Sequence, residues 1–350
     1  MSQTLRTVAT PGAASLRRPV GVRLGWLLAI LAVLAVLVMA SVAFGTRQVG
    51  VDEIVGGLFG TERGDAIGRA AVTKRVPRTV LALLVGAALS VSGATMQAVT
   101  RNPLAEPGIL GVSAGASLAV AMGIVFFGLS DPYEYIVVAI AGAAIASVFV
   151  YCVGSLGRGG ATPLKLALAG AAMAAAFSSL LSAILLPRVD LISNFLFWQV
   201  GGVGGATWDR IGVLVPFLAL GVLICLANAR GMNSLALGDD LAAGLGANVA
   251  RVRLASAVGA VLLCGAATAI AGPIAFVGLV VPHVCRLLVG SDHHWLLPFS
   301  ALGGAALLVA ADVVGRVIAR PAEIEVGIIT AVIGAPVLIW VVRHQKLREL

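Results

Sequence analysis

Long and nearly uncharged apolar runs dominate this chain of 350 residues. Runs of about 17–25 apolar residues recur along it, which is the length that an α-helix needs to cross a hydrocarbon core of roughly 30 Å. Hydrophobic residues make up 59% of the chain and charged residues only 11%, a composition that soluble domains of this size do not have. The 43 glycines fit helices that pack in a membrane through small residues. The sequence therefore predicts an all-α integral membrane protein that crosses the bilayer several times.

Hydropathy predicts ten membrane spans. The first follows a basic lead, residues 1–23, and its apolar run is too long for the core of a signal peptide. With that lead in the cytoplasm, the loop at 228–253 and the tail at 343–350 are also cytoplasmic, and residues 1–350 form one polytopic transmembrane domain. The predicted spans lie at residues 24–45, 78–99, 107–127, 135–154, 166–186, 210–228, 253–271, 275–289, 295–315 and 326–342.

The basic residues give the chain a net charge of +8. They are scattered between the predicted spans and form no stripe, which favours a role in membrane topology over nucleic-acid binding. Six of them gather in the first external loop and at the start of the second span, where the positive-inside rule alone does not place them. We therefore expect another purpose for this group: Arg47, Arg63, Arg69, Lys74, Arg75 and Arg78.

Two similar segments indicate an internal repeat. GAALSVSG occupies residues 86–93 and GAATAIAG occupies residues 265–272. In the predicted topology they run in opposite directions across the membrane, as inverted repeats require. Chance similarity in a chain so rich in Gly and Ala is the alternative. Pro77, before the first segment, is predicted to open the second span, because a proline is well tolerated at the start of a helix.

The sequence predicts no cofactor, no metal site and no ATP site within this chain. Its cysteines lie in or beside apolar segments without a C-x-x-C pair, so we interpret Cys152, Cys225, Cys264 and Cys285 as packing residues. Its histidines, among them His283, His293 and His294, are predicted to be structural or solvated. None of the three lysines follows a glycine, so the chain lacks the P-loop pattern G-x-x-x-x-G-K-[ST].

Several strings, in one order over about residues 25–343, resemble the signature of the iron–siderophore and cobalamin permease family of type II ABC importers. The resemblance implies a vitamin-B12-permease-like fold of about ten helices with inverted repeats. It also implies a second permease subunit, two ATP-binding cassette subunits and an extracytoplasmic substrate-binding protein. The strings are RVPR followed by GAALSVSGATMQAVTRNPLAEPGILGVSAGAS, then LALGDDLAAGLG, AGPIAFVGLVVPHVCRLLVGSDHHWLLP, ADVVGR and EIEVGIITAVIGAPVLIW.

LALGDDLAAGLG, residues 235–246, predicts a short helix between two spans. Gly238 and Asp239 form its N-cap, Asp240 lies in its first turn and Gly246 ends it. So short a helix needs a docking surface, and the resemblance implies a coupling helix that inserts into the ATPase. The alternative is an amphipathic helix on the lipid surface, which two acids and no lysine make unfavourable. The resemblance implies that this segment contacts the ATPase through a polar head, Asp239 and Asp240, and through an apolar face, Met232, Leu235, Leu237, Leu241 and Leu245.

The resemblance also implies sites at both mouths of a pathway. Arg75 and Arg316 match outer positions that dock the binding protein, with Arg78 and Arg320 as weaker matches; an i,i+4 pair with Asp312 is the alternative for Arg316. Asn102, Leu104 and Thr162 match positions of a cytoplasmic gate, and Pro163 stands beside Thr162 where a small polar residue is expected. Ser178, Ser179 and Ser182 are predicted either to line the pathway or to pack tightly.

The predicted function is that of a permease subunit in the bacterial cytoplasmic membrane, without enzymatic activity of its own, which moves a ferric siderophore by alternating access. Cobalamin and haem stay open as substrates. The alternative class is an ion-coupled secondary transporter, which needs ionisable groups near the membrane midplane. Asp312 is the one carboxylate inside a predicted span, and it lies toward the outer end. A scaffold protein would give no reason for the coupling helix or for the NPLAEPG turn.

Overall fold

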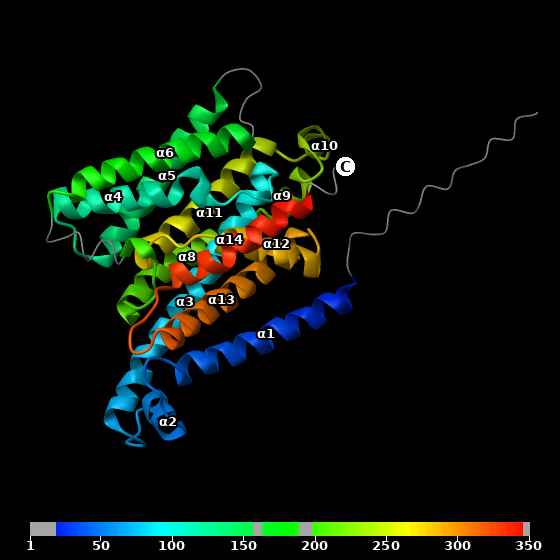
Figure 1. The fold of residues 1–350 in the computed structure, drawn as a ribbon. Coiled ribbons are helices and arrows are strands. Elements are labelled where there is room, and N and C mark those ends of the chain that lie inside the picture. Colours follow the sequence, from blue (N-terminus) through cyan, green and yellow to red (C-terminus); the bar gives the residue numbers. More distant parts are fainter. Residues whose placement is uncertain (1–18, 157–162, 189–197, 346–350) are drawn as a thin grey trace, which may run out of the picture.

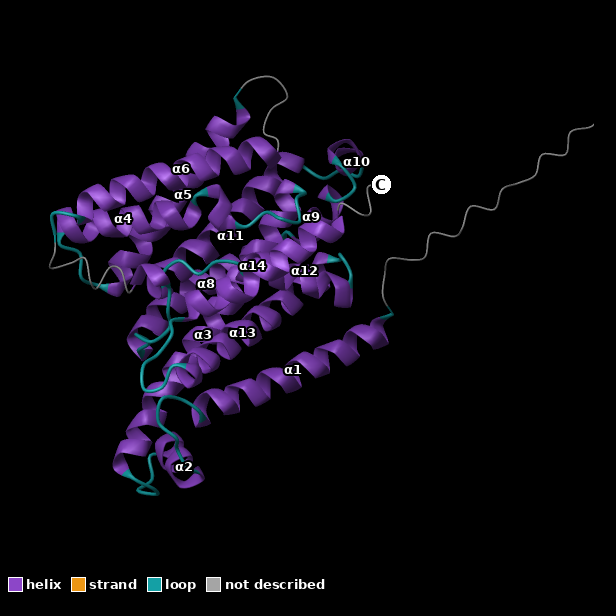
Figure 2. Cartoon of the chain, viewed as in Figure 1, coloured by secondary structure: helices purple, strands orange, loops and turns teal. Residues whose placement is uncertain are grey.

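The computed structural model describes residues 19–156, 163–188 and 198–345, and every regular element within these ranges is a helix (Figures 1 and 2). The predicted all-α class is therefore confirmed. Seven of the described helices are long and apolar enough to cross a membrane. They are α1 (Val20–Ala43), α3 (Ala66–Thr100), α5 (Pro132–Ser155), α6 (Pro163–Leu185), α8 (Trp208–Ala227), α11 (Val249–Ala271) and α13 (His293–Ile318).

Three shorter apolar helices occupy the remaining predicted spans: α4 (Val112–Phe127), α12 (Val277–Val289) and α14 (Val326–Gln345). A single turn of 3-10 helix, η1 (Pro107–Leu110), precedes α4 and takes up the first residues of its predicted span. Three further short helices connect the long ones: α2 (Val51–Phe59), α9 (Ala229–Leu235) and α10 (Asp239–Gly244). Each predicted span thus contains a helix.

Polar caps explain why several helices begin two to four residues earlier than hydropathy predicts. Asp131, Thr207, Asn248 and Asp292 each stand just before a helix, and each side chain accepts a hydrogen bond from a backbone N–H of the first turn. Such caps satisfy donors that have no partner within the helix. They add polar turns to α5, α8, α11 and α13 that an apolar window does not detect.

Helix α3 departs most from its prediction. It begins at Ala66 rather than at residue 78, so Pro77 lies inside the helix instead of opening it. An interior proline removes one backbone hydrogen bond and costs about 3 kcal/mol. Contacts absent from the sequence pattern hold this extended segment in place: Gly57 of α2 packs against the backbone of Arg69 and against Val72, which is buried.

Helices α3 and α11 form the centre of the bundle, whereas α1 and α6 lie at its periphery. The most apolar windows of α3 and α11 are 78% and 67% buried, against 11% for α1 and 17% for α6. Small residues allow the close contacts of α3: a Cβ on Gly93 would meet the backbone of Gly278 in α12, and one on Gly86 would meet the backbone of Gly304 in α13. Small residues thus set the helix spacing here, as expected for a membrane bundle.

The bundle has two ends, which Figure 1 shows at its upper right and lower left. Helices α9 and α10 lie at the first, here named the α10 end, together with the C-terminus of α3 and the N-terminus of α11. Helix α2, the C-terminus of α1 and the start of α3 lie at the second, the α2 end. Because the C-terminus of α3 and the N-terminus of α11 share an end, the two similar sequence segments run in opposite directions, as predicted.

Candidate functional site

The segment between α8 and α11 folds into two short helices rather than one. Helix α9 ends at Leu235, and α10 runs from Asp239 to Gly244. Gly238 precedes α10 with φ 107° and Gly246 follows it with φ 82°, backbone conformations that favour glycine. Gly238, and not Asp239, is the N-cap, and no side chain caps the helix. The predicted short helix is therefore present, and Asp239 is its first residue.

The apolar residues predicted to contact an ATPase divide into two groups. Met232 and Leu235 are fully buried and belong to α9, which packs against α13, α11 and α3. The prediction that they face outward is wrong, because the chain's own core covers them. Leu237, Leu241 and Leu245 are exposed, Leu241 at 63%, and form an apolar surface around α10.

Helix α9 is fixed to the start of α13 by a polar cluster. Asn233 donates from Nδ2 to Asp292 Oδ1 at 2.8 Å, and its Oδ1 accepts from the backbone N of His293 at 2.9 Å. Burial alone would raise the pKa of the Asp292 carboxyl, but hydrogen bonds from Asn233 and His294 lower it below its ordinary value. Arg23 of α1 stacks over Trp295 beside this cluster. His293 and His294 therefore have the structural surroundings expected for them.

The two acids of α10 have different surroundings. Asp239 Oδ1 accepts a hydrogen bond from Arg253 Nη2 at 3.0 Å and forms a second ion pair with Arg101. Asp240 is exposed and has no ion pair among the described residues. The prediction treated both acids as one polar head, whereas the structure pairs the part-exposed Asp239 with two arginines and leaves Asp240 without an ion pair among the described residues.

The predicted gate loop begins directly after α3. Arg101 ends α3 with φ 50°, and Asn102 Oδ1 then accepts from the backbone N of Leu104 at 3.0 Å, a local turn typical of asparagine. Asn102 and Leu104 are half-buried. Thr162 lies outside the described residues, and Pro163 begins α6. The structure therefore describes one side of the predicted gate.

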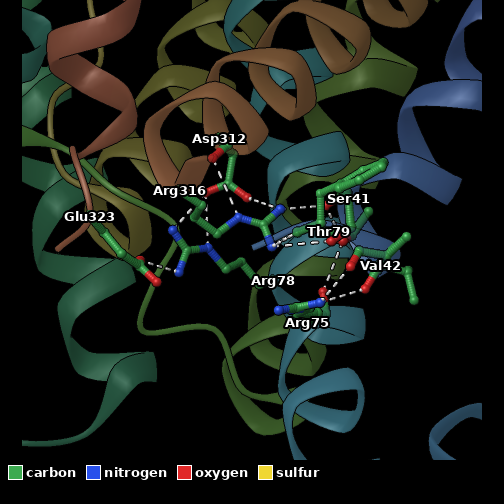
Figure 3. Close-up of polar contacts among 10 residues, drawn as sticks. Ser41, Val42, Arg75, Arg78, Thr79, Asp312, Arg316 and Glu323 are labelled. Carbon is green, nitrogen blue, oxygen red and sulfur yellow. Dashed lines mark hydrogen bonds and ion pairs between the residues drawn. The ribbon is translucent and has the colours of Figure 1, made fainter. Parts of the chain in front are cut away.

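At the α2 end, Arg316 is almost fully buried, with 2% of its surface exposed. Figure 3 shows its guanidinium directed at the C-terminus of α1. Nη1 donates to the backbone oxygens of Ser41 and Phe44 at 3.1 and 3.2 Å, and Nη2 lies 2.8 Å from Asp312 Oδ2. The i,i+4 pair with Asp312 is thus present, as the alternative interpretation of Arg316 predicts.

Arg75 binds the same end of α1. Its Nη1 donates to the backbone oxygens of Val42 and Ala43, both at 3.0 Å, and Nη2 donates to Arg47 O at 2.6 Å. Arg75 is only 7% exposed. Backbone carbonyls at a helix C-terminus lack partners within the helix and carry partial negative charge, so they attract arginine. Arg75 and Arg316 are therefore buried within the helix bundle, and the prediction that they present their charge on the outer surface is wrong.

The two weaker docking candidates lie nearer the surface. Arg78 Nε donates to Asp312 Oδ1 at 2.9 Å, and Nη1 donates to Glu323 Oε2 at 2.6 Å (Figure 3). Asp312 is therefore paired with two arginines, Arg78 and Arg316. Arg320 is half-buried and forms no ion pair among the described residues.

A cavity of about 380 Å³ lies between α6, η1 and the turn before α12. Glu106, Ser113 and Cys264 supply its polar and sulfur atoms, and small residues of α6 such as Ala171 supply much of the rest. The sequence reasoning missed Glu106, although an acid between Ala and Pro in the NPLAEPG turn was a visible signal. Ser178, Ser179 and Ser182 lie elsewhere, exposed on α6, and two of them bond back to their own helix: Ser179 to Ala175 O and Ser182 to Ser178 O.

Comparison with known proteins shows to which family this helix bundle belongs. The FecCD transport family matches residues 33–344. The chain belongs to this family. It is 48% identical over 272 residues to the ferric enterobactin transport system permease protein FepD of Escherichia coli, covering 77% of this chain and 81% of FepD. It is 37% identical over 328 residues to the hemin transport system permease protein HmuU of Yersinia pestis, covering 92% and 96%.

A solved structure agrees with the FecCD assignment. A metal-chelate type ABC transporter in an inward-facing conformation superposes with a TM-score of 0.77 at 29% identity, covering 91% of this chain and 99% of the other. This FecCD chain is thus a multi-pass membrane permease of the iron–siderophore type. The histidine, cysteine and carboxylate residues that the structure describes form no group able to hold a metal ion.

Proposed function

We propose that this FecCD chain is the permease subunit of an ATP-driven importer that carries a ferric siderophore across the cytoplasmic membrane by alternating access. The observation that carries the proposal is the α10 end of the bundle: a short helix with an exposed apolar surface, mounted on a buried helix and linked to the loop that follows α3. A surface of this kind suits a partner that moves, because α9 would transmit its displacement to the core.

The ATPase is a separate subunit in this proposal, and two copies act on two permease subunits. Leu237, Leu241 and Leu245 form the apolar contact, and Asp240 adds an exposed charge. Three large exposed leucines in so small a surface are typical of a protein-binding site. The α10 end then faces the cytoplasm, and both chain termini lie on that side.

The second permease subunit, identical or paralogous, packs against the side of the bundle that carries α6. This helix is long and apolar, yet only 17% of its apolar window is buried by the rest of the chain. With a second copy in place, the exposed Ser178, Ser179 and Ser182 become candidates for the pathway wall, and the lipid bilayer covers the remaining apolar faces. The cytoplasmic gate formed by Asn102, Leu104, Thr162 and Pro163 is likewise part of this proposal.

The extracytoplasmic binding protein docks at the α2 end in this proposal. Arg320 is the candidate contact, because it forms no ion pair among the described residues, whereas Arg78 is shared between Asp312 and Glu323. Rim charges of this kind guide encounter and fix register more than they supply affinity.

A ferric siderophore is favoured because FepD, a ferric enterobactin permease, is 48% identical, while HmuU, a hemin permease, is 37% identical. The longer coverage of HmuU keeps haem as the second candidate, and cobalamin remains the third. Ion-coupled transport is disfavoured, because such transport needs ionisable groups near the membrane midplane, whereas Asp312 lies near one end of α13 and is paired with two arginines.

ATP dependence tests the proposal directly. The permease is co-expressed with its partner ATPase, reconstituted into liposomes with the binding protein outside, and supplied with ferric enterobactin, haem or cobalamin in parallel. We expect uptake only when ATP is enclosed in the liposomes. We also expect faster uptake of the ferric siderophore than of haem or cobalamin. Uptake driven by a proton or sodium gradient without ATP would contradict the proposal.

A further inference from the structure

Three charged side chains from three separate elements meet at the α10 end. Asp239 is the first residue of α10, Arg101 ends α3, and Arg253 lies in the first turns of α11. Both arginines bind the same oxygen, Asp239 Oδ1, with Arg253 Nη2 at 3.0 Å. One carboxylate on the short helix therefore contacts the two central helices of the bundle.

Arg101 stands directly before the loop of Asn102 and Leu104. Its backbone has φ 50° and ψ 34°, the left-handed conformation that usually holds glycine where a helix ends. A side chain at this position is unfavourable for the backbone. Arginine here therefore indicates that the side chain has a use, and the contact that the structure gives it is with Asp239.

The last turn of α3 has a second polar attachment. Gln97 accepts at Oε1 from Arg286 Nη2 of α12 at 2.7 Å. The backbone oxygen of Gln97 also accepts a hydrogen bond from the backbone N–H of Asn102 at 3.2 Å. The start of the loop is thus fixed to α12 on one side and to α10 on the other.

The ion pairs of Asp239 are poorly suited to a purely stabilising role. The side chains of Arg101 and Asp239 remain 38% and 44% exposed, and ion pairs so open to water contribute little to stability. They do constrain orientation, because two guanidinium groups must meet one oxygen. A partner seated on α10 would exclude water and strengthen the same pairs.

We infer that Asp239 is a positioning residue that links α10 to the gate loop through Arg101, so that movement of α10 under the ATPase shifts Asn102 and Leu104. This inference rests on the proposed function and assigns the two adjacent acids different tasks. Asp240 faces the partner, and Asp239 faces the chain's own gate. The sequence-based expectation, in which Asp239 contacts the ATPase, is the competing outcome.

The test measures how many substrate molecules are imported for each ATP hydrolysed by the reconstituted permease–ATPase complex with its binding protein. Asp239→Asn removes the charge, and Arg101→Gly removes the side chain while relieving the backbone of its unfavourable conformation, so this second variant is not expected to misfold. We expect each to keep the ATPase bound and hydrolysing within about twofold of the unaltered complex. The import per ATP should fall at least fivefold, and the double variant should fall no further than either single one.

Two further variants complete the design. Asp239→Glu keeps the carboxylate and should restore at least half of the import per ATP. Arg251→Gln removes an exposed charge from α11 two residues before Arg253 and should leave the ratio unchanged.

The inference is overturned if Asp239→Asn loses the ATPase, which would make Asp239 a docking residue. It is equally overturned by an unchanged import per ATP in Asp239→Asn, or by a loss as large in Arg251→Gln. Failure of the unaltered complex to import with ATP would instead remove the proposed function, and this inference with it.

Discussion

Arg316 and Ser41 are joined twice: Nη1 of the arginine donates to the serine carbonyl oxygen at 3.1 Å, and Nη2 donates to its Oγ at 2.8 Å. They lie 275 residues apart in the sequence. Together with Arg75 and its bonds to Val42 and Ala43, this contact attaches the C-terminal end of α1 to α3 and α13. Because α1 is otherwise little buried, we expect the two arginines to determine how firmly it is held.

The first prediction concerns this attachment. Arg316→Ala leaves the backbone carbonyls of Ser41 and Phe44 without this donor and removes one of the two arginine partners of buried Asp312. Breaking a buried ion pair on one side costs about 3–5 kcal/mol, so thermal unfolding of the purified permease in detergent should occur at a clearly lower temperature. Lys74→Ala, an exposed change one residue from Arg75, is the control. Equal melting of both variants would mean that the attachment contributes nothing.

The second prediction concerns the surface of α10. Leu241→Asp places a charge where a partner should exclude water, at a cost of a few kcal/mol. We expect the variant to reach the membrane but to lose co-purification with the ATPase, and transport with it. Leu241→Met nearly conserves the volume and should keep both. Normal transport by Leu241→Asp would indicate instead that α10 rests on lipid.

The third prediction concerns the binding protein. Arg320→Glu should weaken its docking at low salt, mainly through slower association, and a matching acid-to-lysine change on the partner should partly restore it. Surface plasmon resonance on the permease in nanodiscs measures this. Because Arg75 is buried, Arg75→Gln should instead lower thermal stability. Docking that is insensitive to Arg320→Glu would exclude this residue from the interface.

The fourth prediction concerns helix spacing. Gly93→Ala would bring a methyl group against the backbone of Gly278, and such overpacking typically costs about 1–3 kcal/mol. Gly212→Ala, in α8, meets nothing within 4 Å and should be nearly neutral. Thermal unfolding of both variants under one condition compares the two sites. A tolerated Gly93→Ala would mean that α3 and α12 can move apart without loss.

Much of the fold follows from the sequence because apolar length is a direct physical requirement of the bilayer. The helix starts were harder to predict, since a cap such as Asp292 adds polar residues to α13 that hydropathy averages away. The extension of α3 past Pro77 depends on α2 and α1, and contacts made only after folding are not visible in a local pattern.

The candidate site was predicted unevenly for a related reason. The short helix at Asp239–Gly244 and the exposure of Leu241 follow from glycine positions and local polarity. The motifs alone do not reveal whether an arginine faces water or the protein interior. Arg75 and Arg316 were therefore predicted to lie at the surface, although both bind α1. Similarly, Met232 and Leu241 are both large apolar residues in one short segment, and only the packing of α9 shows that Met232 is buried while Leu241 is exposed.

The position of these arginines along the chain has a consequence for biogenesis. Helix α1 is synthesised before α13, and Arg316 emerges about 240 residues after Arg75, a delay of roughly 10–50 s at ordinary rates of translation. During that interval the C-terminal carbonyls of α1 have Arg75 alone, and Asp312 has not yet been made. The end of α1 is therefore locked in place by a helix made much later, and a ribosome stalled before residue 316 should leave that end of α1 open to protease or to thiol labelling.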